Sequence, residues 1–251
     1  MIDFHAHILP KMDDGSKSIE ESEKMIEASF NQGIEMIVAT PHFYPWLEKP
    51  QDFLLRRTEA IKSLDVPLSK IRVGSEVAYY DGIVNSEDVE LLKIADSNFL
   101  MIEMPMTIWT KRMLDSLHVI EKRTKLKIVI AHLDRYIRAQ KSTFNIDYVC
   151  ENFLIQANAD YFINRRTQRK ALKMINENRI DFIGSDCHNL TSRPPNVGEA
   201  YQAIEKKIGS ISVKAFYDKQ NQYFKGGSID ERQSKLESCP VDNSDSRIAD
   251  V

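Results

Sequence analysis

The chain alternates short, almost wholly apolar runs with longer segments in which apolar residues recur at helical spacing. Continuous apolar runs are typical of parallel strands that are covered on both faces. The segments between them predict helices, and Ser18 with Glu21 forms the capping box with which the first helix begins. Strict alternation of strand and helix predicts a parallel α/β fold. The predicted strands span residues 2–7, 36–42, 71–76, 99–103, 127–132, 159–164 and 181–188.

A polar side chain lies at or near the C-terminal end of every predicted strand. These residues are His5 and His7, His42, Glu76, Glu103, His132, Asn164, and Asp186 with His188. An open doubly wound sheet would spread them along one edge and use only those near its switch point. A closed barrel gathers all of its strand ends around one mouth. We therefore expect a distorted (β/α)7 barrel, similar to a TIM barrel, with a site at its C-terminal mouth.

The barrel is expected to be the single folded domain and to span residues 1–227. The chain of 251 residues is long enough for one large core, and no central segment rich in proline, glycine and serine divides it. After Gly226 and Gly227 the sequence becomes polar and loses its helical periodicity. Residues 228–251 are therefore expected to form a flexible C-terminal tail.

Composition narrows the expected environment and partners. The net charge of −3 gives no indication of a nucleic-acid partner. Cys150, Cys187 and Cys239 form no CxxC pattern, which favours a reducing compartment. The first strand begins at residue 2, which leaves no room for a signal peptide, and no apolar run approaches the length of a membrane span. We expect a cytoplasmic protein that neither binds nucleic acid nor inserts into a membrane.

The chemistry of the strand ends indicates metal ions. His5 and His7 alternate with Ala6 along one strand, so both rings are expected to face the same way and to reach one ion. One such pair can arise by chance, but ionisable groups buried at apolar strand ends destabilise a fold unless their charge is compensated. The candidate ligands are His5, His7, Asp14, His42, Glu76, Glu103, His132, Asp186 and His188.

All of these ligands are nitrogen or oxygen donors. They suit zinc, manganese, iron or magnesium-like ions, and the share of carboxylates favours the harder ions. The set is larger than one ion needs, so we expect two or three divalent ions joined by bridging carboxylates. Such clusters produce a metal-bound hydroxide that is nucleophilic at neutral pH.

Two arginines closely follow candidate ligands in the sequence. Arg135 comes after His132, and Arg193 comes after His188. The planar guanidinium group matches phosphate geometry through paired hydrogen bonds, so both arginines are candidate catalytic residues that hold a substrate phosphate. The alternative is that each forms a surface salt bridge, for example with Asp134.

A second phosphatase pattern is rejected. Cys187 and Arg193 have the Cys-x5-Arg spacing of cysteine-dependent phosphatases, in which a thiolate attacks phosphorus. The loop between them has no glycine to let its amides converge on phosphate. Cys187 also alternates with Asp186 and His188, so it is expected to face away from the metal ions.

Taken together, the motifs resemble the PHP (polymerase and histidinol phosphatase) superfamily, and within it the manganese-dependent, capsule-type tyrosine-protein phosphatases of the CpsB/CapC family. The resemblance covers about residues 1–225. The motifs that carry it are Asp3-Phe-His-Ala-His7, Asp13-Asp-Gly15, Thr40-Pro-His42, Gly74-Ser-Glu76, Ile102-Glu103, Ile130-Ala-His132-Leu-Asp-Arg135-Tyr136 and Ser185-Asp186-Cys-His188-Asn.

The resemblance implies a trinuclear site in a (β/α)7 barrel. By matching positions, one ion is expected to take His5, His7, Glu76 and Asp186. A second is expected to take Asp14, His42 and His188, and a third Glu76, Glu103 and His132. Arg135 and Arg193 match the arginines that hold the phosphate. Asn164-Arg-Arg166 departs from the serine-rich segment expected after the sixth strand, which leaves the peptide preference open.

The implied activity is hydrolysis of phosphotyrosine on a bacterial tyrosine autokinase that regulates capsule or exopolysaccharide synthesis. Manganese is the expected metal, with zinc or iron as alternatives. Two other functions stay open: a small-molecule phosphatase of the same superfamily, such as one that acts on histidinol phosphate, and a metal-binding scaffold for the kinase without catalytic activity.

Overall fold

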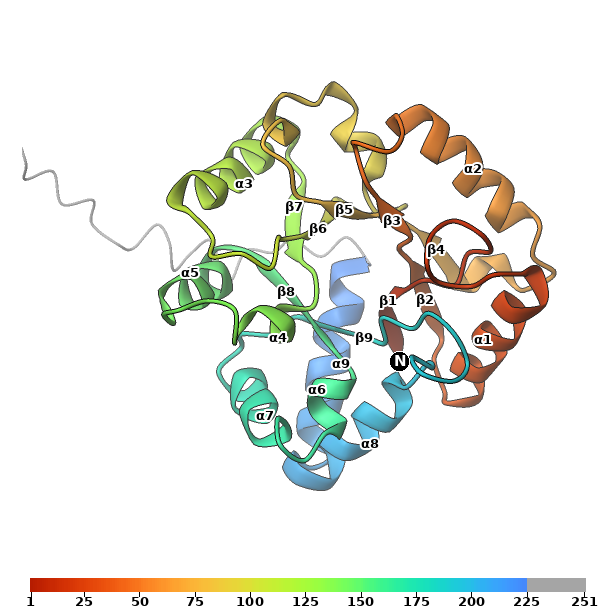
Figure 1. The fold of residues 1–251 in the computed structure, drawn as a ribbon. Coiled ribbons are helices and arrows are strands. Elements are labelled where there is room, and N and C mark those ends of the chain that lie inside the picture. Colours follow the sequence, from red (N-terminus) through yellow and green to blue (C-terminus); the bar gives the residue numbers. More distant parts are fainter. Residues whose placement is uncertain (225–251) are drawn as a thin grey trace, which may run out of the picture.

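The computed structural model describes residues 1–224. Parallel strands lie in the middle of the molecule and helices surround them (Figure 1). The predicted domain boundary at residue 227 and the predicted tail of residues 228–251 lie outside the described residues. Along this described part, no helix combines the length and the apolar character that crossing a bilayer requires.

The strands are short and every pair of neighbours runs in parallel. Two predicted strands are each interrupted, at Thr40–Pro41 and at Gly74–Ser75, so that each appears as two pieces. Proline has no N–H group for the ladder, which accounts for the first interruption. The strands are β1 Ile2–Ala6, β2 Met36–Ala39, β3 His42–Phe43, β4 Ile71–Val73, β5 Glu76–Ala78, β6 Phe99–Glu103, β7 Lys127–Ile130, β8 Leu154–Asn158 and β9 Phe182–Gly184.

The strands form one curled surface whose two ends meet. Strands β1, β2 and β4 are paired in that order. Strands β3 and β5 continue β2 and β4, and the order then runs β3, β5, β6, β7, β8 and β9. The chain after β9 returns to β1, where the Asp186 amide donates to the His5 carbonyl (2.7 Å) and the His7 amide donates to the Cys187 carbonyl (3.0 Å). The predicted distorted (β/α)7 barrel is confirmed.

The predicted position of the sixth strand is wrong. The strand is β8, Leu154–Asn158, whereas the predicted residues 159–164 contain the short helix α6, Asp160–Ile163. The strand was missed because Gln156 and Asn158 interrupt its apolar run, yet all five residues of β8 are buried. Asn164 therefore lies in the exposed turn after α6, and the predicted place of Asn164 at the end of the sixth strand is wrong.

The outer helices match the predicted segments. Ser18 caps α1 by accepting a hydrogen bond from the Glu21 amide (3.2 Å). The helix expected near residues 87–94 is a 3-10 helix, η3 Glu87–Leu92. The remaining bounds are α1 Ile19–Asn31, α2 Pro50–Lys62, η1 Leu68–Lys70, η2 Ile83–Asn85, α3 Lys111–Thr124, α4 Leu133–Tyr136, α5 Phe144–Asn152, α7 Gln168–Asn176, α8 Val197–Ile208 and α9 Ser210–Phe224.

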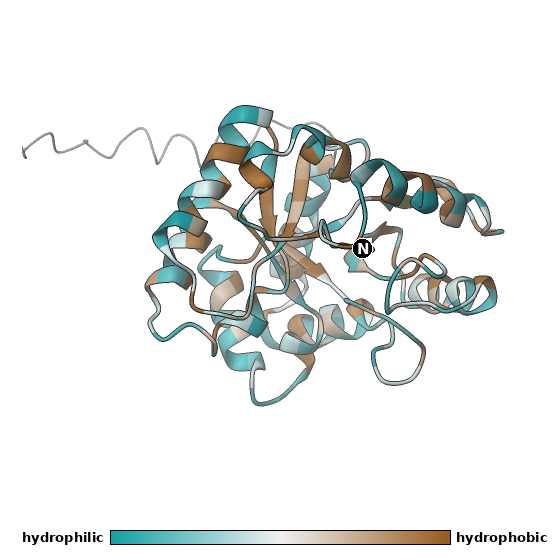
Figure 2. Ribbon diagram, turned by 45° about the horizontal axis from the view of Figure 1, so that its top comes forward, coloured by the Kyte–Doolittle hydropathy of each residue, from teal (hydrophilic) through white to brown (hydrophobic). Residues whose placement is uncertain are grey.

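Apolar packing fills the end of the barrel opposite to the predicted site. The central strands are largely hydrophobic, whereas the helices carry their polar residues outward (Figure 2). Phe99 and Phe182 are the first residues of their strands, and both rings contact Phe4. Phe224 at the end of α9 packs on Phe4 and Phe99. This arrangement leaves the C-terminal ends of the strands as the open mouth.

Candidate metal centre

The structure brings all of the predicted metal ligands together at the barrel mouth, around Glu76. Oε2 of this fully buried carboxylate lies 3.1 Å from His5 Nε2, 3.2 Å from His7 Nε2 and 3.0 Å from His42 Nδ1. Its other oxygen, Oε1, lies 2.7 Å from His132 Nε2. One carboxylate from β5 thus contacts histidines that come from three other strands.

Asp186 and Asp14 extend the cluster on one side. Asp186 Oδ1 lies 3.8 Å from His5 Nε2 and 3.5 Å from His7 Nε2. Asp14 Oδ1 lies 3.6 Å from His42 Nε2 and 3.3 Å from His188 Nε2. Asp14 is the most exposed member of the cluster, with a side chain that is 65% exposed. It therefore has the freedom to move onto an ion.

Glu103 extends the cluster on the other side. Its carboxylate lies 3.5 Å from His132 Nε2 and 3.8 Å from His42 Nδ1. The sixth histidine of the chain, His118, is separate from this centre. It lies on α3 and contacts the Tyr148 hydroxyl (2.9 Å).

The donor atoms fit divalent ions better than they fit one another. His5 Nε2 and His7 Nε2 lie only 3.0 Å apart. Within the described chain, His42 Nδ1 and His188 Nε2 are buried and form no well-aligned hydrogen bond, although carboxylate oxygens lie 3.0 Å and 3.3 Å from them. Nitrogen and carboxylate atoms within 4.8 Å of one another form three groups: His7, Asp14, His42 and His188; His5, His7 and Asp186; and His42, Glu76 and Glu103. Buried atoms of this kind need a ligand, and metal ions fit their chemistry.

Charge within the cluster shifts the pKa of its members in opposite directions. Burial alone would raise the pKa of Glu76, but the surrounding histidines, His5 and His132 foremost, hold it well below the ordinary value. Burial would lower the pKa of His132, but Glu103 and Glu76 raise it to about 9. Burial, together with the charges of His7 and Arg193, lowers the pKa of His188 to about 4. His188 is therefore neutral at pH 7, as a metal ligand must be.

The residue that orients His7 was not predicted from the sequence. Asp13 accepts a hydrogen bond from His7 Nδ1 (2.7 Å) and from the amides of His42 (2.8 Å) and Gly15 (2.8 Å). A carboxylate on Nδ1 fixes the ring so that Nε2 faces the metal. The sequence signal was the Asp-Asp-Gly motif, in which only Asp14 was assigned a role. Gly15 lies so close to His7 that an added Cβ would approach the His7 carbonyl oxygen to 2.4 Å.

Two amide side chains of β8 were also missed. The Gln156 side-chain oxygen contacts His5 Nδ1 (3.1 Å) and accepts from the His132 amide (2.6 Å). The Gln156 side-chain nitrogen donates to Asn158 (3.1 Å), and Asn158 in turn donates to Asp186 Oδ2 (2.9 Å). This relay connects three ligands through one strand.

The backbone of two ligands adopts the left-handed conformation that side chains other than glycine rarely take. His132 has φ of 30° and Asp186 has φ of 52°. Such strain concentrates at functional sites, where the surrounding structure holds it in place. Gly184 of β9 permits the close approach of His5, because an added Cβ would lie 2.5 Å from the His5 Cβ.

The two predicted arginines converge on one ligand. Arg135 and Arg193 both pair with Asp186, the latter through Nη2 at 2.6 Å. Neither forms an ion pair with Asp134 among the residues that the structure describes, so the alternative of a surface salt bridge to Asp134 is not found. Both side chains are about one-third exposed, at 37% and 35%. Their remaining N–H groups can therefore reach an anion at the mouth.

Cys187 lies away from the centre, as predicted. Its side chain is fully buried in the apolar core. Burial, with the nearby charge of Asp3, raises the pKa of its thiol far above the ordinary value. A thiol in this position stays protonated and does not serve as a nucleophile.

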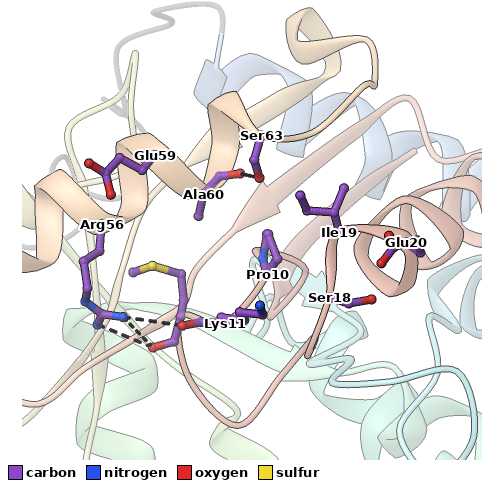
Figure 3. Close-up of a pocket in the computed structure, with 10 residues that line it drawn as sticks. Pro10, Lys11, Ser18, Ile19, Glu20, Arg56, Glu59, Ala60 and Ser63 are labelled. Carbon is purple, nitrogen blue, oxygen red and sulfur yellow. Dashed lines mark hydrogen bonds between the residues drawn. The ribbon is translucent and has the colours of Figure 1, made fainter.

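Arg56 of α2 supports the loop that carries Asp14. Its guanidinium donates to the carbonyls of Lys11 (3.5 Å) and Met12 (3.4 Å), beside a cavity of about 420 Å³ between this loop and α2 (Figure 3). It also pairs with Glu48 (2.6 Å). A second cavity, of about 430 Å³, shares Met12 and Arg56 with the first and reaches the centre at Asp14.

Comparison with known sequences agrees with the resemblance seen in the motifs. The family model for capsular polysaccharide synthesis, CpsB/CapC, matches residues 1–223. Tyrosine-protein phosphatase CpsB of Streptococcus agalactiae serotype V is 29% identical over 257 residues, which cover 95% of this chain and 99% of the relative. Tyrosine-protein phosphatase YwqE of Bacillus subtilis strain 168 is 28% identical over 224 residues, which cover 84% and 86% of the two chains.

Comparison with solved structures supports the fold. One similar structure comes from work on YwqE from Bacillus subtilis and CpsB from Streptococcus pneumoniae, described as unique metal-dependent tyrosine phosphatases. It matches with a TM-score of 0.77 at 24% identity and covers 91% of this chain and 96% of that chain. The phosphotriesterase homology protein of Escherichia coli, with phosphate in its active site, matches with a TM-score of 0.50 at 10% identity and covers 89% and 98%.

Proposed function

This chain belongs to the capsular polysaccharide synthesis CpsB/CapC family, and we propose that it is a metal-dependent phosphatase that hydrolyses phosphotyrosine in proteins. Relatives that match over most of their length bear the name tyrosine-protein phosphatase. The observation in this chain that carries the proposal is the convergence of the donors around Glu76 beside Arg135 and Arg193. The donors account for the metal dependence, and the arginines account for phosphate as the group bound.

We propose that the donors hold two or three divalent ions. The first would take His5, His7, Glu76 and Asp186. The second would take Asp14, His42 and His188, and the third Glu76, Glu103 and His132. The contacts of Glu76 with histidines from both the first and the third set support its role as a bridge. Manganese is the proposed metal because of the large share of carboxylates, and zinc or iron would also suit the histidines.

When bound, the ions supply Lewis acidity that polarises the phosphoryl group and lowers the pKa of water. Arg135 and Arg193 would hold two phosphate oxygens and stabilise the charge that develops on them. A phenolate leaving group has an ordinary pKa near 10, so it needs little help from a general acid. No covalent phosphoenzyme is proposed, because Cys187, which stands between Asp186 and His188, is buried in the apolar core.

The proposed protein substrate is the phosphotyrosine of a bacterial tyrosine autokinase that regulates capsule or exopolysaccharide synthesis, and the proposed location is the cytoplasm. The family description names capsular polysaccharide synthesis, which supports this assignment. No contact with membrane lipid or nucleic acid is needed for the reaction.

The ratio of kcat/KM on a phosphotyrosyl peptide to kcat/KM on histidinol phosphate tests the substrate class. A ratio well above one with the manganese-loaded protein is expected. A ratio well below one would favour the small-molecule phosphatase of the same superfamily.

The scaffold alternative is tested with p-nitrophenyl phosphate. A protein that had lost catalysis should show gaps in its donor set, whereas every predicted ligand is present in the cluster. Turnover that rises with added manganese is expected, and no turnover with manganese, zinc, iron or magnesium would favour the scaffold.

A further inference from the structure

A cavity of about 430 Å³ opens directly beside the metal centre. Its volume lies within the range of about 300–1,000 Å³ that is typical of small-molecule sites. Asp14 and His42 form its polar end, and both belong to the proposed ligand set. A group bound through phosphate at the centre can therefore extend into this cavity without a break.

The wall of the cavity next to His42 is aromatic. Tyr44 follows β3, and its ring is stacked against the His42 ring at a centroid distance of 5.1 Å with an angle of 25° between the planes. Trp46 is not among the lining residues, and its ring lies 5.3 Å from that of Tyr44. Leu47 and Met12 complete the apolar lining. Flat aromatic walls of this kind favour an aryl group.

The charges in the cavity also favour a neutral group. Arg56 and Glu48, the two charged residues away from the centre, neutralise each other in a close ion pair (2.6 Å). No unpaired charge in this part of the cavity would select a second ionic group.

The apolar side chains near the opening of the cavity are exposed to solvent, and a bound ligand would cover them in part. The side chains of Trp46 and Leu47 are 64% and 71% exposed. The phosphate-binding arginines lie at Asp186, which contacts His5 and His7, whereas Tyr44 lies at His42. A phosphate ester placed between them would turn its ester oxygen toward the cavity.

From this arrangement we infer that the cavity is the aryl subsite of the enzyme, and that Tyr44 is the residue that selects aryl over alkyl phosphate esters. The inference rests on the proposed phosphotyrosine phosphatase function and deepens it. The phenyl ring of the substrate tyrosine would lie along Tyr44, with Leu47 of the same turn as a further apolar contact.

Binding of two phosphonates to the manganese-loaded protein, measured by titration calorimetry, tests this assignment without turnover. Phenylphosphonate and methylphosphonate carry the same anionic head, and only the first carries a ring. The unaltered protein is expected to bind phenylphosphonate at least about tenfold more tightly than methylphosphonate, because the ring is buried in contact with an aromatic side chain. In Tyr44→Ala the preference should fall to about threefold or less, with methylphosphonate binding unchanged, and Tyr44→Phe should keep it.

Controls separate the subsite from the centre. Tyr148→Ala removes a half-exposed tyrosine on α5 and should leave the preference intact. Leu47→Ala alters the apolar lining at a side chain too exposed to affect folding, and should also reduce the preference. An undiminished preference in both Tyr44→Ala and Leu47→Ala, or no preference in the unaltered protein, would overturn the subsite while phosphotyrosine turnover could stand. Failure of the metal-loaded protein to bind either phosphonate would overturn the proposed function as well.

Discussion

Oδ2 of Asp13 lies 2.7 Å from Nδ1 of His7, on the side of the ring opposite to the metal centre. The same carboxylate accepts the His42 amide, so it positions two ligands at once. Burial would raise the pKa of Asp13, but His7 lowers it well below the ordinary value, so the Asp13 carboxylate stays charged. Asp13 is a positioning residue, whereas its neighbour Asp14 faces His42 and His188.

Replacing Asp13 should weaken metal binding without removing a ligand. Asp13→Asn is expected to reduce manganese affinity by about 10–100-fold, the usual effect of losing a carboxylate that orients a metal-binding histidine. Calorimetric titration of the metal-free protein measures it. Asp115→Asn, at a half-exposed position on α3, is the matched control. Unchanged affinity in Asp13→Asn would show that the hydrogen bond does not orient His7.

The β8 relay should matter for stability as well as for the metal. Gln156→Leu leaves the His132 amide and His5 Nδ1 without their shared acceptor inside the barrel. Removing one partner of a buried hydrogen bond costs about 1–3 kcal/mol, so the free energy of unfolding in urea should fall by about that amount. Gln168→Leu, which replaces a half-buried glutamine at the start of α7, is the control for the change from glutamine to leucine. Equal stability of the Gln156 variant and the parent protein would contradict the relay.

The arginines should affect catalysis more than metal content. Arg135→Lys and Arg193→Lys keep the positive charge but lose the paired N–H geometry that matches phosphate. Each is expected to lower kcat/KM on a phosphotyrosyl peptide by about 100–1,000-fold, the range seen when a donor to transition-state charge is lost. Manganese content should stay that of the parent protein. A loss of bound metal equal to the loss of activity would instead assign the arginines to support of Asp186.

Cys187→Ser and chelation give opposite expected outcomes. The serine variant should keep most of its activity, because the thiol is buried in the core and protonated. Removing the divalent ions with a chelator should abolish turnover in both proteins. Retained turnover in chelator, together with loss in the serine variant, would reverse the mechanism.

The stability of the metal-free protein should depend on pH through His132. Its folded pKa of about 9 exceeds the ordinary value of 6.5, so the folded state binds the proton more tightly than the unfolded state. The resulting stabilisation, on the order of 3 kcal/mol, is fully present below pH 6.5 and is lost as pH rises through 9. The Tm of metal-free protein should therefore fall between pH 7 and 9. The Tm of metal-free His132→Gln should fall less over the same pH range. An identical decline in the variant and the parent protein would contradict the assignment.

Most of the donors that meet around Glu76 could be placed from the sequence because they lie in or after a recognisable apolar run, whereas Asp14 stands in a polar loop. His42, Glu76, Glu103 and His132 needed only the expectation that strand ends meet at one mouth. Asp13 could not be separated from Asp14 by residue type, because the turn that aims one carboxylate at His7 Nδ1 and the other at the ions is a matter of backbone geometry.

The sixth strand shows where pattern alone fails. Gln156 and Asn158 are polar but buried, and their sequence pattern is more typical of the polar end of a helix than of a buried strand. Their burial becomes intelligible only when their partners, His5 and Asp186, are present from distant strands. The cavity beside Tyr44 was equally invisible, since the residues that line it come from two separate loops and from α2.

The central claim is that several divalent ions held around Glu76 make this chain a phosphotyrosine phosphatase. Its most direct test is phosphate release from a phosphotyrosyl peptide as manganese is titrated into the metal-free protein. We predict no release without metal and a rate that saturates at two or three ions bound per chain, with Glu76→Gln inactive at every ratio. Release in the absence of metal, or no release at saturating manganese, would contradict the account.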